Sequence, residues 1–142
     1  MDKDRILKKV DTLNGYLKEL RQIFPQQFSE YQKSEKKRAS ERLLQISIEC
    51  VLDICSLIVS GLKLGLPGEQ DDFFKKLEKT RIIDPSLSRR LKEMKGLRNL
   101  LVHEYGEIED EIIFGILARR LNDFELFKKS ILKFLNTSAK WK

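Results

Sequence analysis

The sequence predicts an all-α fold, an up-and-down helical bundle of about five helices in one domain spanning residues 1–142. Helix breakers are few, with seven Gly and three Pro, and they fall mainly between stretches whose apolar residues recur every three or four positions. No stretch alternates apolar and polar residues as a half-buried strand does. A chain of this length is also suited to a single hydrophobic core.

The first helix is predicted over residues 3–24. Asp2 directly precedes the periodic stretch and is a suitable N-cap, whereas Pro25 disfavours helical continuation. Residues 26–33 are expected to add a short turn. The positions that keep helical spacing, and are therefore expected to face the core, are Ile6, Val10, Leu13, Leu17 and Leu20.

The second helix is predicted over residues 34–60 and is apolar on several sides, which is typical of a central helix with several packing partners. The most apolar segment, residues 46–66, contains the charged residues Glu49, Asp53 and Lys63. These charges favour a buried core helix over a membrane span.

The two cysteines, Cys50 and Cys55, lie in this helix. Five helical residues turn them about 140° apart, so a disulfide between them is not expected. Two buried thiols suggest a reducing compartment, and the first ten residues lack a signal peptide. We therefore expect a cytoplasmic protein. With one His and no Cys-x-x-Cys motif, no metal site is predicted.

After a Gly- and Pro-rich loop, a short helix is predicted over residues 70–80. Asp84 and Pro85 read as the N-cap and first residue of the next helix, and Gly106 stands where its C-terminal cap is expected. The last helix is predicted as one element over residues 109–135, and residues 136–142 are expected to fray. Its inward positions are expected to be Ile112, Ile113, Ile116, Leu117, Leu121, Phe124, Phe127, Ile131 and Phe134.

The formal net charge of +6 favours polyanionic partners. Hydrophobic residues make up 41% of the chain and charged residues 35%, which fits a folded chain with a highly charged surface. Two groups of basic residues are candidates for tracking an RNA backbone, although such groups are more often simply solvated helix faces. They are the run Lys33, Lys36, Lys37 and Arg38, and the pair Arg89 and Arg90.

Chemistry-bearing residues concentrate between Arg98 and Tyr105, in the order Arg-Asn-Leu-Leu-Val-His-Glu-Tyr. The only histidine of the chain, His103, is suited to proton transfer near neutral pH. Arg98 offers a permanently charged donor fork that matches phosphate. Asn99 and Tyr105 add polar supports. On one straight helix Arg98 and His103 would lie about 140° apart, so they converge only through long side chains, a helix distortion or a second subunit.

This segment resembles the Arg-x4-His-x-Tyr signature of HepT-like proteins, a family of HEPN ribonucleases. The stretch ERLLQISIECVLDICSLIV, residues 41–59, resembles the second helix of that family. The resemblance extends over most of the chain. It implies a HEPN-like two-fold homodimer and a metal-independent endoribonuclease that needs no cofactor and whose catalytic residues are Arg98 and His103.

The resemblance also implies a partner. Such a chain would be the toxin of a type VII-like toxin–antitoxin pair and would cut RNA. A nucleotidyltransferase antitoxin of the MntA type would silence it by adenylylating Tyr105. Two other roles stay open: a HEPN module that binds without cutting, and a substrate-binding subunit of a nucleotidyltransferase complex.

A mechanism follows from the residue chemistry. His103 would act as base towards a ribose 2′-hydroxyl, and Arg98 would stabilise charge on the attacked phosphate. Asp53 is a weaker candidate for a supporting role. An acidic group in an apolar helix needs a partner. The candidate partners are Arg98, His103 and a surface lysine.

Overall fold

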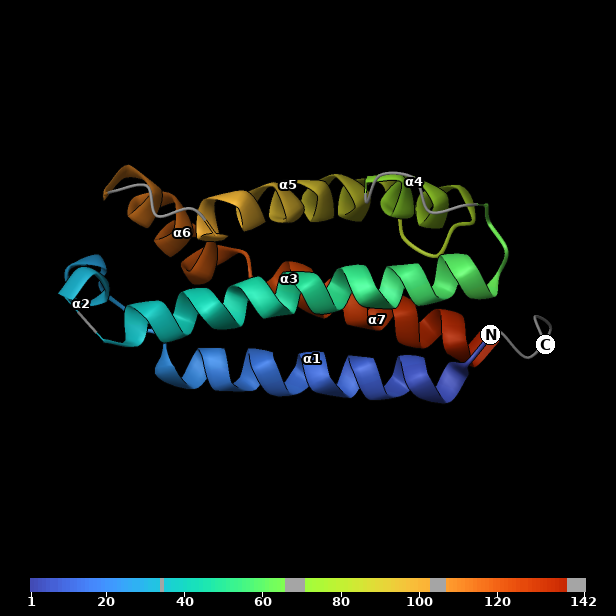
Figure 1. The fold of residues 1–142 in the computed structure, drawn as a ribbon, viewed down its shortest axis with the longest axis horizontal. Coiled ribbons are helices and arrows are strands. Elements are labelled where there is room, and N and C mark those ends of the chain that lie inside the picture. Colours follow the sequence, from blue (N-terminus) through green and yellow to red (C-terminus); the bar gives the residue numbers. More distant parts are fainter. Residues whose placement is uncertain (34, 66–70, 103–106, 138–142) are drawn as a thin grey trace.

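The computed structural model describes residues 1–33, 35–65, 71–102 and 107–137 (Figure 1). These residues form seven helices and no strand, which confirms the all-α prediction. In chain order the helices are α1 (Lys3–Ile23), α2 (Phe28–Lys33), α3 (Lys36–Gly61), α4 (Asp71–Lys79), α5 (Pro85–Val102), α6 (Glu107–Arg119) and α7 (Asn122–Thr137).

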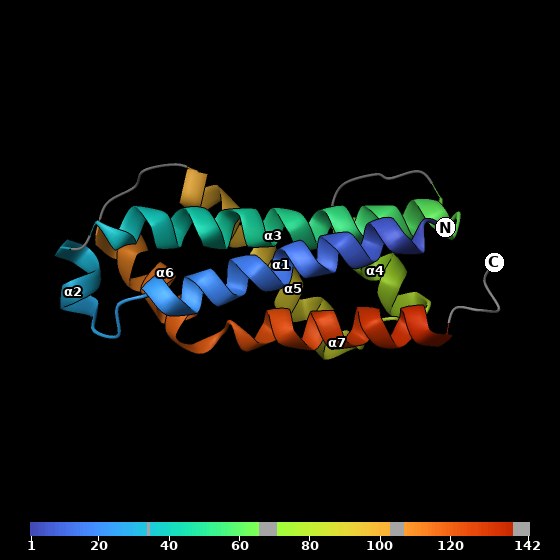
Figure 2. The ribbon, with the colours of Figure 1, turned by 90° about the horizontal axis from the view of Figure 1, so that it is seen from below.

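The long helix α3 is the central element of the bundle. It packs on α1 along one side, while α4 and α5 pack on its other side (Figure 1). In the perpendicular view α7 runs beside α1 (Figure 2), and Lys128 Nζ donates a 2.6 Å hydrogen bond to Asn14 Oδ1 between these two helices. The sequence colours of Figure 1 show that α5 runs antiparallel to α3, so the C-terminal end of α5 lies near the N-terminal half of α3.

Two predicted N-caps are confirmed. The Asp2 carboxylate accepts a 3.1 Å hydrogen bond from the Arg5 backbone N–H at the start of α1. The Asp84 carboxylate accepts a 2.7 Å bond from the Leu87 backbone N–H at the start of α5. These caps satisfy amide groups that have no partner within a helix. The five apolar positions predicted to face inward from the first helix are all buried.

The central helix α3 is buried as its composition predicts. By length and hydropathy alone, α3 is the one helix in the described part of the chain that could cross a membrane, but most of its apolar window is buried inside the bundle. Cys50 and Cys55 are both buried and free. Burial raises the pKa of Cys50 to about 11 and also raises that of Cys55. Neither thiol is therefore a reactive thiolate at neutral pH.

The prediction of one continuous last helix is wrong. The helix ends at Arg119, and α7 begins at Asn122. The two helices pack on different partners: α6 packs on α2, and α7 packs on α5. Arg120 fixes the break: its guanidinium contacts Glu93 at 2.8 Å and Asp123 at 3.1 Å. The apolar period continues through this point, so periodicity alone did not reveal the break.

Two smaller expectations also need correction. Residues 28–33 form a complete short helix, α2, rather than a turn. Ile112, predicted to face inward, is 44% exposed, because α6 packs through its other face, where Ile113, Ile116 and Leu117 are buried. Gly106 and residues 138–142 lie outside the described residues, so the predicted cap and frayed tail stay predictions.

The carboxylate of Asp123 joins α5 to the start of α7. It is 6% exposed and pairs with Arg90 at 3.2 Å as well as with Arg120. Removing it leaves two cations without this partner. We therefore expect Asp123→Ala to lower the free energy of unfolding by about 2 kcal/mol, measured by urea denaturation. The control Glu93→Ala removes a 52% exposed carboxylate from Arg120 and should lower the free energy of unfolding by only about 0.5 kcal/mol. Equal losses would contradict this account.

Candidate active site

Arg98 lies on the inward stripe of α5. It stands four, seven and eleven residues after Met94, Leu91 and Leu87 respectively, a spacing that keeps all four positions on one helix face. The three apolar residues are buried, and Arg98 itself is half-buried. The helix thus directs Arg98 toward the interior side of the bundle rather than into open solvent.

The Arg98 guanidinium forms no hydrogen bond or ion pair with any residue that the structure describes. Other arginines that pack against helices in this protein, Arg21, Arg90 and Arg120, each contact a carboxylate. A partly buried cation without a carboxylate is unfavourable unless another anion binds it. Among the described residues nothing competes with a phosphate group for Arg98, whose planar fork suits that ligand.

Of the other three motif residues, only the backbone of Asn99 lies in the described part of the chain. Asn99 belongs to α5, but its side chain lies outside the described part of the chain, as do His103 and Tyr105. The helix α5 is described through Val102, the residue immediately before His103. The convergence of Arg98 and His103, and the roles of Asn99 and Tyr105, therefore stay predictions.

An aromatic cluster holds together the end of the bundle near α6. Phe24, Phe28, Tyr31 and Phe114 come from α2, α6 and the segment after α1, and their ring centroids lie 5.3–6.4 Å apart. Tyr31 donates a 2.6 Å hydrogen bond to Glu41. Burial and this carboxylate raise the pKa of Tyr31, so its hydroxyl stays protonated. Sequence reasoning missed this cluster because its members are dispersed over residues 24–114.

Asp53 is not a partner of Arg98. Its side chain is 58% exposed, and its carboxylate contacts Lys9 of α1 at 3.4 Å. Of the three partners weighed for this residue, the structure shows the surface lysine. Asp53 faces α1, whereas Arg98 belongs to α5, which packs on a different side of α3. His103, the other motif partner weighed for Asp53, lies outside the described residues, so a supporting role for Asp53 stays a prediction.

Among the described residues, no three His, Cys, Asp or Glu side chains group together as a metal site. A cavity of about 420 Å³ opens at the opposite end of α5 from Arg98, between the end of α3 and α7. Several of its lining hydroxyls already donate to backbone carbonyls. Its lining residues are Leu62, Leu64, Thr80, Arg81, Ile82, Asp84, Ser130, Lys133, Phe134 and Thr137.

The family model described as "Ribonuclease HepT-like" matches residues 13–131, which includes the whole segment from Arg98 to Tyr105. The chain belongs to the HepT-like family. The tRNA nuclease HepT of Aphanizomenon flos-aquae is 31% identical over 91% of this chain and 88% of its own length. The mRNA nuclease HepT of Shewanella oneidensis is 33% identical over 87% of this chain and 93% of its own length.

Solved structures agree with this HepT-like assignment. A chain of an MntA toxin–antitoxin complex superposes with a TM-score of 0.84, at 30% identity, over 92% of this chain and 98% of that chain. The tri-AMPylated HEPN toxin of Shewanella oneidensis, in complex with an MNT antitoxin, gives 0.82 at 30% identity over 94% and 98%. The fold predicted from sequence is therefore that of HepT toxins.

Proposed function

We propose that this HepT-like chain is the toxin of a toxin–antitoxin pair and cleaves RNA without a metal ion, through Arg98 and His103. The proposal rests on the placement of Arg98 and on its lack of a described anionic partner. This arginine is half-buried on the inward stripe of α5, has no described anionic partner, and begins the Arg-x4-His-x-Tyr segment. A phosphate of the RNA supplies the missing anion.

The reaction follows from these groups. His103 accepts the proton of a ribose 2′-hydroxyl, and the 2′-oxygen then bonds to the adjacent phosphorus as the bond to the 5′-oxygen breaks. Arg98 stabilises the negative charge that builds on the phosphate oxygens. The products are a 2′,3′-cyclic phosphate and a 5′-hydroxyl. DNA is not a substrate, because it lacks the 2′-hydroxyl.

We infer that the active form is a two-fold homodimer. The leaving 5′-oxygen needs a proton while the 2′-hydroxyl loses one, and a chain with a single histidine supplies one imidazole. Two-fold symmetry brings a second His103 and a second Arg98 to the same cleft. The expected assembly is checked by sedimentation equilibrium of the purified chain.

The proposed partner is a nucleotidyltransferase of the MntA type that transfers AMP to Tyr105. The AMP group would place a bulky anion beside Arg98 and would compete there with the RNA phosphate. The solved HEPN toxin that carries AMP groups in complex with its MNT antitoxin supports this regulation. We place the pair in the cytoplasm, in agreement with the free thiols of Cys50 and Cys55.

The test is cleavage of a mixture of cellular RNAs by the purified chain in the presence of EDTA. We expect fragments that end in a 2′,3′-cyclic phosphate, identified by mass spectrometry, and no cleavage of DNA of the same sequence. Cleavage that disappears in EDTA and returns with a divalent ion would contradict the metal-free route. Binding of RNA with no cleavage under any condition would instead favour a non-catalytic HEPN module.

A further inference from the structure

The positive charge of the chain is concentrated in one segment. Residues 75–98 contain nine Lys or Arg and three Asp or Glu, so their surplus of six equals the net charge of the whole protein. The rest of the chain is electrically balanced. This segment comprises most of α4 and of α5, which lie together on the side of α3 opposite α1 (Figure 1).

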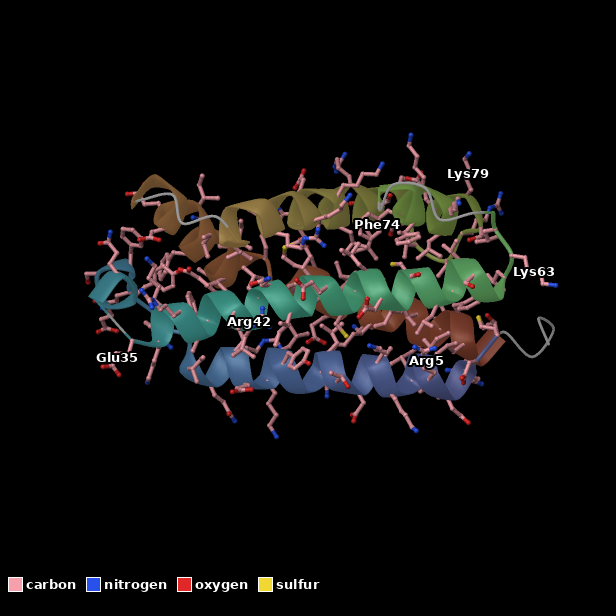
Figure 3. The ribbon with its side chains drawn as sticks, in the orientation of Figure 1. Arg5, Glu35, Arg42, Lys63, Phe74 and Lys79 are labelled. Carbon is pink, nitrogen blue, oxygen red and sulfur yellow. The ribbon has the colours of Figure 1, made fainter. Side chains whose placement is uncertain are left out.

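Many of these cations are free to bind an anion. Arg90 pairs with Asp123, but six others, Arg98 among them, have no hydrogen bond or ion pair with a described residue. Of the three acidic groups, Asp84 caps α5 and Glu93 pairs with Arg120. Figure 3 shows Lys79 on the outer side of α4, whereas Phe74 of the same helix points toward α3. The five besides Arg98 are Lys75, Lys79, Arg81, Arg89 and Lys92.

Within α5 the free cations Arg89 and Lys92, together with Gly96, form a ridge that leads to the C-terminal end of the helix. Arg89, Lys92 and Gly96 are spaced three and four residues apart, which places them on one helix face. Arg89 and Gly96 are exposed, and Lys92 is half-buried. The ridge runs toward Val102, after which His103 follows. It is distinct from the inward stripe on which Arg98 lies.

Among the described residues there is no steric reason for position 96 to be glycine. A Cβ built at this position meets no atom within 4 Å. Glycine inside a helix costs about 1 kcal/mol relative to alanine. A bare helix backbone beyond Lys92 on the exposed face of α5 allows a phosphate chain to approach more closely than a side chain would permit.

We propose that the α5 ridge, Arg89, Lys92 and Gly96, together with Lys75 and Lys79 of α4, binds the backbone of single-stranded RNA and leads it to Arg98 and His103. This inference rests on the proposed function and assigns the surface that holds its substrate. Free cations spaced along a helix neutralise successive phosphates without reading bases. The contacts made by the ridge are therefore expected to be independent of RNA sequence.

The charge test uses the full chain carrying His103→Ala, which prevents cleavage during measurement. The probe is a short fluorescein-labelled single-stranded RNA, and its affinity is measured by anisotropy at several salt concentrations. Adding Arg89→Gln and Lys92→Gln should weaken binding about 10-fold or more and reduce the salt slope by about 1.4, because each phosphate contact contributes about 0.7. The matched control is Lys8→Gln with Lys18→Gln, two exposed lysines of α1, which should leave both quantities unchanged.

The glycine test separates binding from folding. Gly96→Ala should raise the melting temperature by a few degrees through helix propensity and yet weaken RNA binding severalfold. Gly15→Ala is the matched control, because Gly15 is also an exposed position within a helix, with no atom within 4 Å of a built Cβ. It should raise the melting temperature similarly without changing RNA affinity.

Unchanged RNA affinity in the Arg89/Lys92 variant overturns the inference. If this variant also no longer bound the nucleotidyltransferase, the ridge would be a protein-docking surface instead. Dissociation of the dimer in the Gly96→Ala variant would overturn it by showing that a second subunit covers the ridge. Because binding is measured without cleavage, failure of the ridge is distinguishable from failure of the proposed ribonuclease activity, which only the EDTA assay addresses.

Discussion

Replacing His103 with Ala should reduce RNA cleavage by roughly 10²- to 10⁴-fold, because this substitution removes the proposed base of the reaction. Arg98→Ala should reduce cleavage by about 10²- to 10³-fold, because it removes a cation that stabilises the transition state. Arg98→Lys keeps the charge but loses the planar fork and should fall between wild type and Arg98→Ala. Rates are measured under single-turnover conditions with EDTA present.

Two controls make this result specific. Arg119→Ala removes an exposed arginine of the neighbouring helix α6 and should leave the rate unchanged. The melting temperature of each variant shows whether a lost rate reflects unfolding. Arg98→Ala should not lower it, because the half-buried guanidinium has no carboxylate partner among the described residues. Full cleavage by either motif variant would remove that residue from the mechanism.

Replacing Tyr105 with Phe should make the toxin insensitive to its proposed antitoxin. Phe lacks the hydroxyl that would bond to the phosphorus of AMP, so incubation with the nucleotidyltransferase and ATP should add no AMP to this variant. Wild-type chain treated in the same way should gain AMP, detected by intact-mass spectrometry, and should lose its RNA cleavage. The variant should keep cleaving after the same treatment.

Tyr31→Phe is the matched control for the tyrosine. It removes a buried hydroxyl that is bonded to Glu41, and it should leave AMP addition to the chain intact. AMP on the Tyr105→Phe variant would move the modification to another residue. Transfer of AMP to a third molecule, with none on the chain, would instead favour the role of a substrate-binding subunit.

The sequence by itself determined the fold class and most helix boundaries. Its apolar residues recur with helical period, and Asp2, Pro25 and Asp84 carry local signals for helix starts and ends. These signals depend on neighbouring residues only, so they can be read without a partner. The Arg-x4-His-x-Tyr segment likewise identified the family, because its residues are close together in the chain.

Only the tertiary structure decided which surfaces those helices present to one another. The break between α6 and α7 depends on Arg90, Glu93 and Asp123 meeting around Arg120, and Ile112 is exposed because α6 packs through another face. The partner of Asp53 is likewise a lysine from a helix more than 40 positions away. Such contacts join residues that are distant in the sequence, and helical periodicity carries no information about which helix will lie opposite.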